Sequence, residues 1–122
     1  MLKILVIDDS AFLRHYVRMA MEEAGFVVED FLPSGIVELQ EKLKAMEPDL
    51  VLTDFHMPSV DGLTVTRTVR RHSTTVPIVV LTAARDADRD TRLQGYAPLT
   101  VLHKPITGEA LVESLQRILA GE

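Results

Sequence analysis

The sequence predicts an α/β fold in which a doubly wound, five-stranded parallel sheet has helices on both faces. The prediction depends on two observations. Short apolar runs alternate with longer segments of helical periodicity five times along the 122 residues. Strands that alternate with helices in this way are typical of parallel sheets that are covered on both sides. We therefore expect a single domain over residues 1–122, since no internal repeat or linker divides the chain.

The first half of the chain predicts three strands and two helices. Residues 3–7 are an apolar, β-branched run, and residues 10–24 carry an apolar stripe at helical spacing that ends at a glycine. A second strand is expected over 27–31, and its two acidic residues favour an edge of the sheet. A helix is expected over 34–46, and a proline separates it from an apolar strand over 50–54.

The second half predicts two more strands and three more helices. A short helix over 63–71 precedes an apolar strand over 77–82. The segment 85–94 is expected to be a weaker helix, because it is highly charged and has few apolar residues. A strand over 99–103 and an amphipathic helix over 107–120 complete the alternation.

The composition of the strands predicts their order. The first, third and fourth strands are continuously apolar, which suits central positions, and the charged second strand suits an edge. The flavodoxin-like order 2-1-3-4-5 satisfies both conditions. Ligands of such sheets bind beyond the carboxyl ends of the strands, near the switch point between strands 1 and 3.

Composition excludes several classes of function. The chain has no cysteine, so thiolate metal sites and thiol catalysis are excluded. Its net charge of −5 argues against direct nucleic acid binding. No apolar run approaches the ~20 residues that span a bilayer, and the N-terminus does not resemble a signal peptide. We expect a cytoplasmic protein without membrane contact.

Polar residues follow four of the expected strands at their carboxyl ends. Asp8 and Asp9 follow the first strand, Asp54 ends the third, Thr82 ends the fourth and Lys104 follows the fifth. Strands 1 and 3 are neighbours about 4.8 Å apart, so three carboxylates converge. Such crowding is unfavourable unless a cation or protons neutralise it. Hard oxygen ligands without histidine or cysteine side chains favour Mg²⁺ as a cofactor.

Each of these residues also has a purely structural interpretation. The Asp8-Asp9-Ser10 segment could cap the first helix, and Asp54 could begin a turn. Thr82 could be an ordinary strand residue or a cap, and Lys104 a solvated strand end. These interpretations require five coincidences at one edge of one sheet, so a shared site is favoured.

Four motifs resemble a known family. The segment from Asp54 to Gly62 matches the pattern D-x-x-M-P-x-x-D-G of response-regulator receiver domains. Three further landmarks stand where that family has them: Asp8-Asp9-Ser10, Thr82-Ala83-Ala84 and Lys104-Pro105. The resemblance covers essentially the whole chain and implies a phosphorylation-activated switch of a two-component system.

The resemblance also implies roles for individual residues. Asp54 would accept a phosphoryl group from a sensor histidine kinase or a phosphotransfer protein. Asp9 and Asp54 would bind Mg²⁺ directly, together with the backbone carbonyl of His56, and Asp8 would act through water. Thr82 and Lys104 would hold the phosphoryl oxygens. The domain would then promote its own phosphorylation and dephosphorylation without being an enzyme that acts on other substrates.

Two residues of the last strand depart from the family pattern. The family usually has tyrosine or phenylalanine where this chain has Val101, and an apolar residue where it has His103. Alternation places both on one face of the last strand, towards the last two helices, with His103 expected to be partly buried. Without an aromatic switch, we expect the signal to leave through the loosely anchored segment 85–94.

Alternative functions remain open on the sequence. A small aspartyl phosphatase would use two aspartates, but in the spacing D-x-D rather than adjacent as in Asp8-Asp9. A flavodoxin-like flavin carrier would need hydroxyls and amides in the first loop, where the two carboxylates would repel a phosphate. The chain could also be a receiver module of a longer protein. The cognate kinase and the output partner are not predicted.

Overall fold

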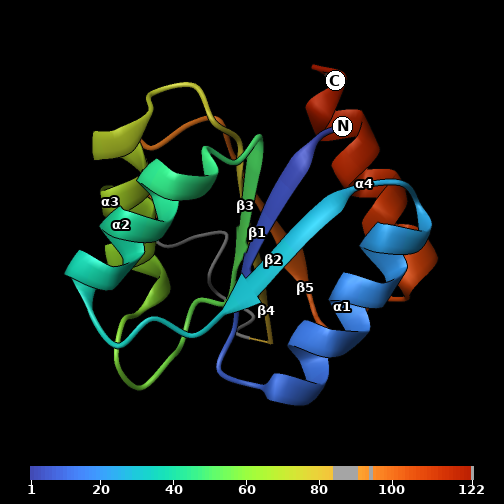
Figure 1. Ribbon diagram of the computed structural model, residues 1–122, viewed down its shortest axis with the longest axis horizontal. Helices are drawn as coiled ribbons and strands as arrows, with labels where there is room; N and C mark the ends of the chain where they lie inside the picture. Colours follow the sequence, from blue (N-terminus) through green and yellow to red (C-terminus); the bar gives the residue numbers. More distant parts are fainter. Residues whose placement is uncertain (84–90, 94, 122) are drawn as a thin grey trace.

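The computed structural model describes residues 1–83, 91–93 and 95–121 of the chain (Figure 1). It contains a five-stranded, all-parallel sheet in the order β2-β1-β3-β4-β5. The predicted fold class and strand order are therefore confirmed. The strands are β1 (Lys3–Ile7), β2 (Val27–Phe31), β3 (Leu50–Thr53), β4 (Ile78–Thr82) and β5 (Leu99–His103).

In the described part of the chain, two helices cover each face of the sheet (Figure 1). On one face lie α1 (Ala11–Glu23) and α4 (Gly108–Leu119), and on the other lie α2 (Ile36–Met46) and α3 (Gly62–His72). These bounds agree with the sequence prediction to within two residues. The helices begin after their predicted starts where a side chain caps them, because Ser10 and Thr107 accept hydrogen bonds from N–H groups of the first turn.

Strand β1 shows how the sheet divides the core into two layers. Leu5 and Ile7 pack in the cluster that includes α2 and α3, whereas Ile4 and Val6 pack in the cluster that includes α1 and α4. All four side chains are buried. A continuous apolar run was therefore the right signature for a strand between two helical layers.

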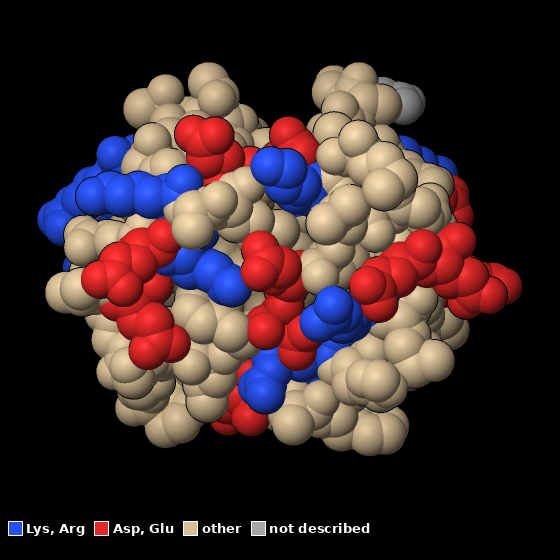
Figure 2. All heavy atoms as spheres, in the orientation of Figure 1, with Lys and Arg blue, Asp and Glu red and all other residues tan. Residues whose placement is uncertain are grey.

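The acidic residues of β2 have a structural reason. Arg18 of α1 contacts Asp30 at 2.8 Å, and Lys42 of α2 contacts Glu29 at 2.9 Å. The two pairs tie the edge strand to helices on opposite faces of the sheet. Figure 2 shows acidic and basic atoms interspersed over this side of the molecule.

The segment 85–94, predicted as a helix, lies mostly outside the described residues. Within it, the short 3-10 helix η2 (Thr91–Leu93) is described, and Leu93 is buried in the same core layer as α2 and α3. The predicted looseness of residues 85–90 and 94 remains a prediction.

The last strand corrects two expectations. Val101 packs against the layer of α2 and α3, whereas the last helix, α4, lies on the opposite face. His103 is exposed rather than partly buried. His103 ends an edge strand, because β5 pairs only with β4 among the described strands. A final residue at such an edge has less structure over it than one in a central strand.

None of the helices in the described part of the chain has the length and apolar character of a membrane span.

Candidate functional site

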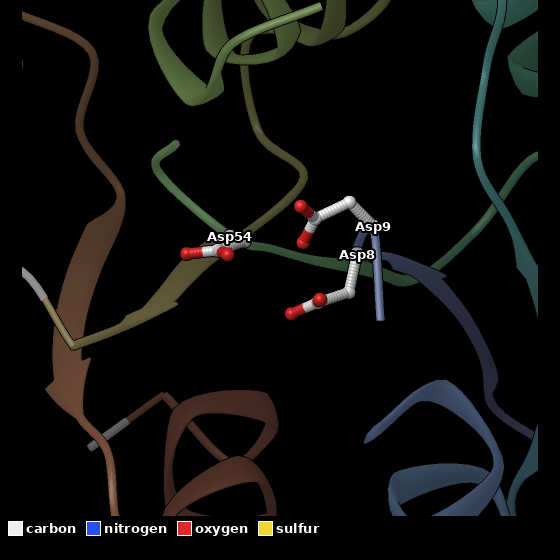
Figure 3. A group of neighbouring side chains, drawn as sticks. All are labelled: Asp8, Asp9 and Asp54. Atoms are coloured by element: carbon white, nitrogen blue, oxygen red, sulfur yellow. The ribbon is translucent and has the colours of Figure 1, made fainter. Parts of the chain in front are cut away.

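Three carboxylates meet where β1 and β3 end. Ile7 and Thr53 are partners in the parallel register, so the residues that follow them, Asp8 and Asp54, lie side by side. The N–H of Asp54 also donates to the carbonyl of Ile7 at 3.0 Å. One carboxylate oxygen each of Asp8, Asp9 and Asp54 lies within 4.8 Å of the other two (Figure 3). The adjacent aspartates after the first strand therefore do converge with the aspartate after the third.

The three carboxylates differ in burial. Asp8 and Asp54 are 4% and 8% exposed, whereas Asp9 is exposed. Burial raises the pKa of Asp8 above its usual value of 3.8, and the hydrogen bond from the N–H of Ser10 and the charge of Lys104 act in the opposite direction. A buried carboxylate that is costly to ionise is well placed to bind a cation.

Lys104, which directly follows β5, extends its side chain to the acidic cluster. Its Nζ lies 3.1 Å from Oδ2 of Asp8 and 3.5 Å from Oδ2 of Asp54. The lysine backbone is fixed as well, because its N–H donates to the carbonyl of Thr82 at 2.9 Å. Three carboxylates and one ammonium leave an excess of negative charge, which suits a divalent cation.

The two remaining predicted site residues lie at the same end of the sheet. Thr82 is 1% exposed and is paired in register with His103, next to Lys104. His56 is exposed in the loop after Asp54, and its ring packs edge-on against Phe55, with 4.9 Å between ring centroids.

Close backbone packing explains why the motif that begins at Asp54 ends in a glycine, Gly62. Its N–H donates to the carbonyl of Phe55 at 2.7 Å. A Cβ at Gly62 would lie 2.7 Å from both the carbonyl oxygen of Asp54 and the Cα of Phe55. Asp61 caps α3 through a 2.8 Å hydrogen bond from the N–H of Thr64. The start of α3 therefore packs directly on the backbone of Asp54.

Sequence reasoning missed Arg14. This residue of α1 donates a hydrogen bond from Nη1 to the backbone carbonyl of Asp8, and its Nε lies 3.4 Å from Oδ2 of Asp30. It thus links the acidic loop to β2. The available signal was a basic residue one turn into the helix that follows the two aspartates, but helix patterning alone assigns it to the surface.

The fold and the site together are those of a receiver domain. The family model described as "Response regulator receiver domain" matches residues 4–116, so the chain belongs to this family. It is a receiver domain of two-component systems, as the motifs predicted.

Individual relatives and solved structures support the same family assignment. The chain is 32% identical over 116 residues to a probable C4-dicarboxylate response regulator, DctR, of Halalkalibacterium halodurans; the match covers 94% of this chain and 50% of that protein. The structure resembles chemotaxis protein CheY4 of Vibrio cholerae, with a TM-score of 0.86, 28% identity and coverage of 97% and 98% of the two chains. It also resembles response regulator TrrA of Thermotoga maritima in complex with Mg²⁺ and BeF, with a TM-score of 0.83, 26% identity and coverage of 97% and 99%. The chain spans about half the length of the first curated relatives.

Proposed function

We propose that Asp54 is the phosphoacceptor of this receiver domain and receives a phosphoryl group from a phosphohistidine of a sensor histidine kinase or a phosphotransfer protein. The observation that supports this most directly is the position of its carboxylate. It is nearly buried, lies among two further carboxylates within 4.8 Å, and has the ammonium of Lys104 at 3.5 Å.

The hydrogen bonds of Asp54 orient its carboxylate. Oδ1 accepts a 2.7 Å hydrogen bond from the N–H of Phe55, whereas Oδ2 is directed to Lys104. We propose Oδ2 as the nucleophile that attacks phosphorus in line, since Lys104 then lies beside the charge of the incoming phosphoryl group. Thr82 would donate its hydroxyl to a phosphoryl oxygen, and Lys104 would supply a positive point charge.

The acidic cluster fits a divalent cation. Asp9, Asp54 and the carbonyl of His56 would hold Mg²⁺, with Asp8 acting through water, and the ion would neutralise the charge between the carboxylate and the phosphoryl oxygens. Lys104 already neutralises part of the cluster, so the chain's own residues need only one such ion.

The phosphorylated state would act as a signal. The added negative charge would draw Lys104 and Thr82 inward, and the domain would also promote its own dephosphorylation. The route through residues 85–94 remains a prediction, because residues 85–90 and 94 lie outside the described part of the chain. The single-domain extent over 1–122 and the cytoplasmic location also remain predictions.

Chemical phosphorylation tests the assignment. The protein is incubated with acetyl phosphate and Mg²⁺, and its intact mass is measured. We expect a phosphoryl increment in the wild type and its loss in Asp54→Asn. Asp49→Asn is the matched control, because Asp49 precedes the same strand at its opposite end and its asparagine can still accept the N–H of Lys3. Labelling of Asp54→Asn to the wild-type extent would refute the proposal, and turnover of phosphomonoesters would favour a phosphatase instead.

A further inference from the structure

A hollow with basic walls lies at the C-terminal end of α3, away from the acidic cluster. It has a volume of about 310 Å³ and is lined by Arg67, Arg70, Arg71 and Tyr96. We call these four residues the arginine groove. The chain that leads into β5 passes beside the end of α3 here (Figure 1). None of the functions proposed above uses this surface.

Arg70 is the fixed floor of the groove. Its guanidinium donates to four backbone carbonyls: those of Tyr96 at 2.9 Å, Val76 at 2.6 Å, Pro98 at 2.8 Å and Ser73 at 3.2 Å. All four acceptors are neutral. Among the described residues, the charge of Arg70 therefore has carbonyl dipoles around it but no carboxylate, and burial lowers its pKa below the usual value. An anion above Arg70 would relieve this cost.

Arg67 and Arg71 are the exposed walls. They lie four residues apart on one helix face, and both side chains are exposed. The Nε of Arg67 donates to the hydroxyl of Tyr96 at 3.3 Å, which engages one edge of this exposed guanidinium. Like charges at this spacing destabilise a helix by about 0.2–0.5 kcal/mol. Within residues 1–83, 91–93 and 95–121, no carboxylate lies at ion-pair distance from either guanidinium.

Three other cations of the described chain have carboxylate partners. Arg18, Lys42 and Arg117 each contact a carboxylate within 3.3 Å. Favourable interaction with the helix dipole accounts for basic residues in the last turn of α3, but Arg67 lies before that turn. The dipole therefore does not explain why three arginines share one face.

We propose that the arginine groove is a docking surface for an acidic segment of a partner protein. Planar guanidinium groups pair bidentately with carboxylates. Arg67 and Arg71 are about 6 Å apart at the level of Cβ, which suits carboxylates two residues apart in an extended chain or four apart in a helix. Small-molecule pockets are lined mostly by apolar side chains, and this groove is not. The overall charge of −5 disfavours nucleic acid.

Peptide binding tests the proposal without any phosphoryl donor, so its outcome is independent of Asp54. The probe is a fluorescein-labelled decapeptide of alternating glutamate and glycine, and the matched peptide has glutamine in place of glutamate. Fluorescence anisotropy at low ionic strength should show binding of the glutamate peptide only. Binding should weaken as salt is raised, because exposed charges are screened beyond about 8 Å at physiological ionic strength.

Charge reversal locates the surface. Arg71→Glu should weaken glutamate-peptide binding about tenfold or more, which corresponds to about 1.4 kcal/mol. Lys44→Glu is the control, because Lys44 is also an exposed base in the last turn of a helix, α2, and makes the same change in net charge. Arg67→Gln removes a wall of the groove with less risk to folding. Circular dichroism checks that all three variants are folded.

Three outcomes would overturn the proposal. The first is equal loss of binding in Arg71→Glu and Lys44→Glu, which would indicate a general charge effect. The second is no binding of the glutamate peptide by the wild type. The third is tighter binding of ATP or of a DNA oligonucleotide than of the peptide, with the same dependence on Arg67 and Arg71, which would assign the groove to another class of ligand.

Discussion

Replacing Asp9 by asparagine should stabilise the metal-free protein and remove most of the stabilisation that Mg²⁺ confers. Asp9 contributes a carboxylate oxygen to the cluster with Asp8 and Asp54. Its side chain makes no hydrogen bond or ion pair with another described residue, and asparagine keeps its shape. The substitution therefore removes charge repulsion without leaving a partner unsatisfied.

The spacing of the cluster sets the size of the effect. At 4.8 Å, two unit charges repel by about 3.5 kcal/mol at an effective dielectric constant of about 20, and by about 0.9 kcal/mol at that of water. Asp9 is exposed, so the lower figure applies to each of its two neighbours, and Lys104 offsets part of the sum. We expect a gain of about 1 kcal/mol, or roughly 4 °C in Tm for a domain of this size.

Urea denaturation with EDTA and with Mg²⁺ measures both parts of the prediction. Mg²⁺ at 100 times its Kd would stabilise the wild type by about 2.7 kcal/mol, and most of this increment should be absent from Asp9→Asn. Glu41→Gln makes the same charge change at an exposed position of α2 and should alter neither value. If Asp9→Asn is less stable than wild type in EDTA and still responds fully to Mg²⁺, the reasoning is wrong.

Two further predictions concern the backbone and the protonation of the site. Gly62→Ala should destabilise the fold by about 1–3 kcal/mol and slow labelling of Asp54, because the new Cβ would meet backbone atoms at 2.7 Å. Gly35→Ala, where a Cβ meets nothing within 4 Å, should cost less in the same denaturation assay, and equal losses would contradict the packing argument. The raised pKa of Asp8 means that its carboxyl group holds a proton more tightly in the native state than in the unfolded state. The protonated carboxyl therefore contributes stability at pH below 3.8, and this contribution is lost as pH rises through the native pKa. Asp8→Asn should therefore gain stability relative to wild type in EDTA as pH rises above 3.8, and a difference that does not vary with pH would show that burial of this carboxylate is not costly.

The sequence by itself determined the architecture because its signals are local. An apolar strand run followed by helical periodicity is readable residue by residue, and the continuous apolar character of β1, β3 and β4 placed them centrally. The predicted site residues at the strand ends followed from the same logic. Parallel strands bring their carboxyl ends to one edge, so Asp8, Asp9 and Asp54 had to converge once the order was known.

The tertiary structure decided everything that depends on which side chains reach across the fold. The acidic residues of β2 indicated only an edge, and the structure added that they bind Arg18 and Lys42 from opposite helical layers. His103 was expected to be partly buried from alternation along the strand, but exposure at the end of an edge strand is set by what packs over it.

Two arginines show most clearly which contacts only the tertiary structure decided. Arg14 and Arg70 both look like surface residues of amphipathic helices. In the structure, Arg14 holds the backbone of Asp8, and Arg70 joins α3 to the segments before β4 and β5. A guanidinium at the end of a long side chain contacts residues far away in the sequence, so its partners are fixed by the packing of whole elements and not by local pattern.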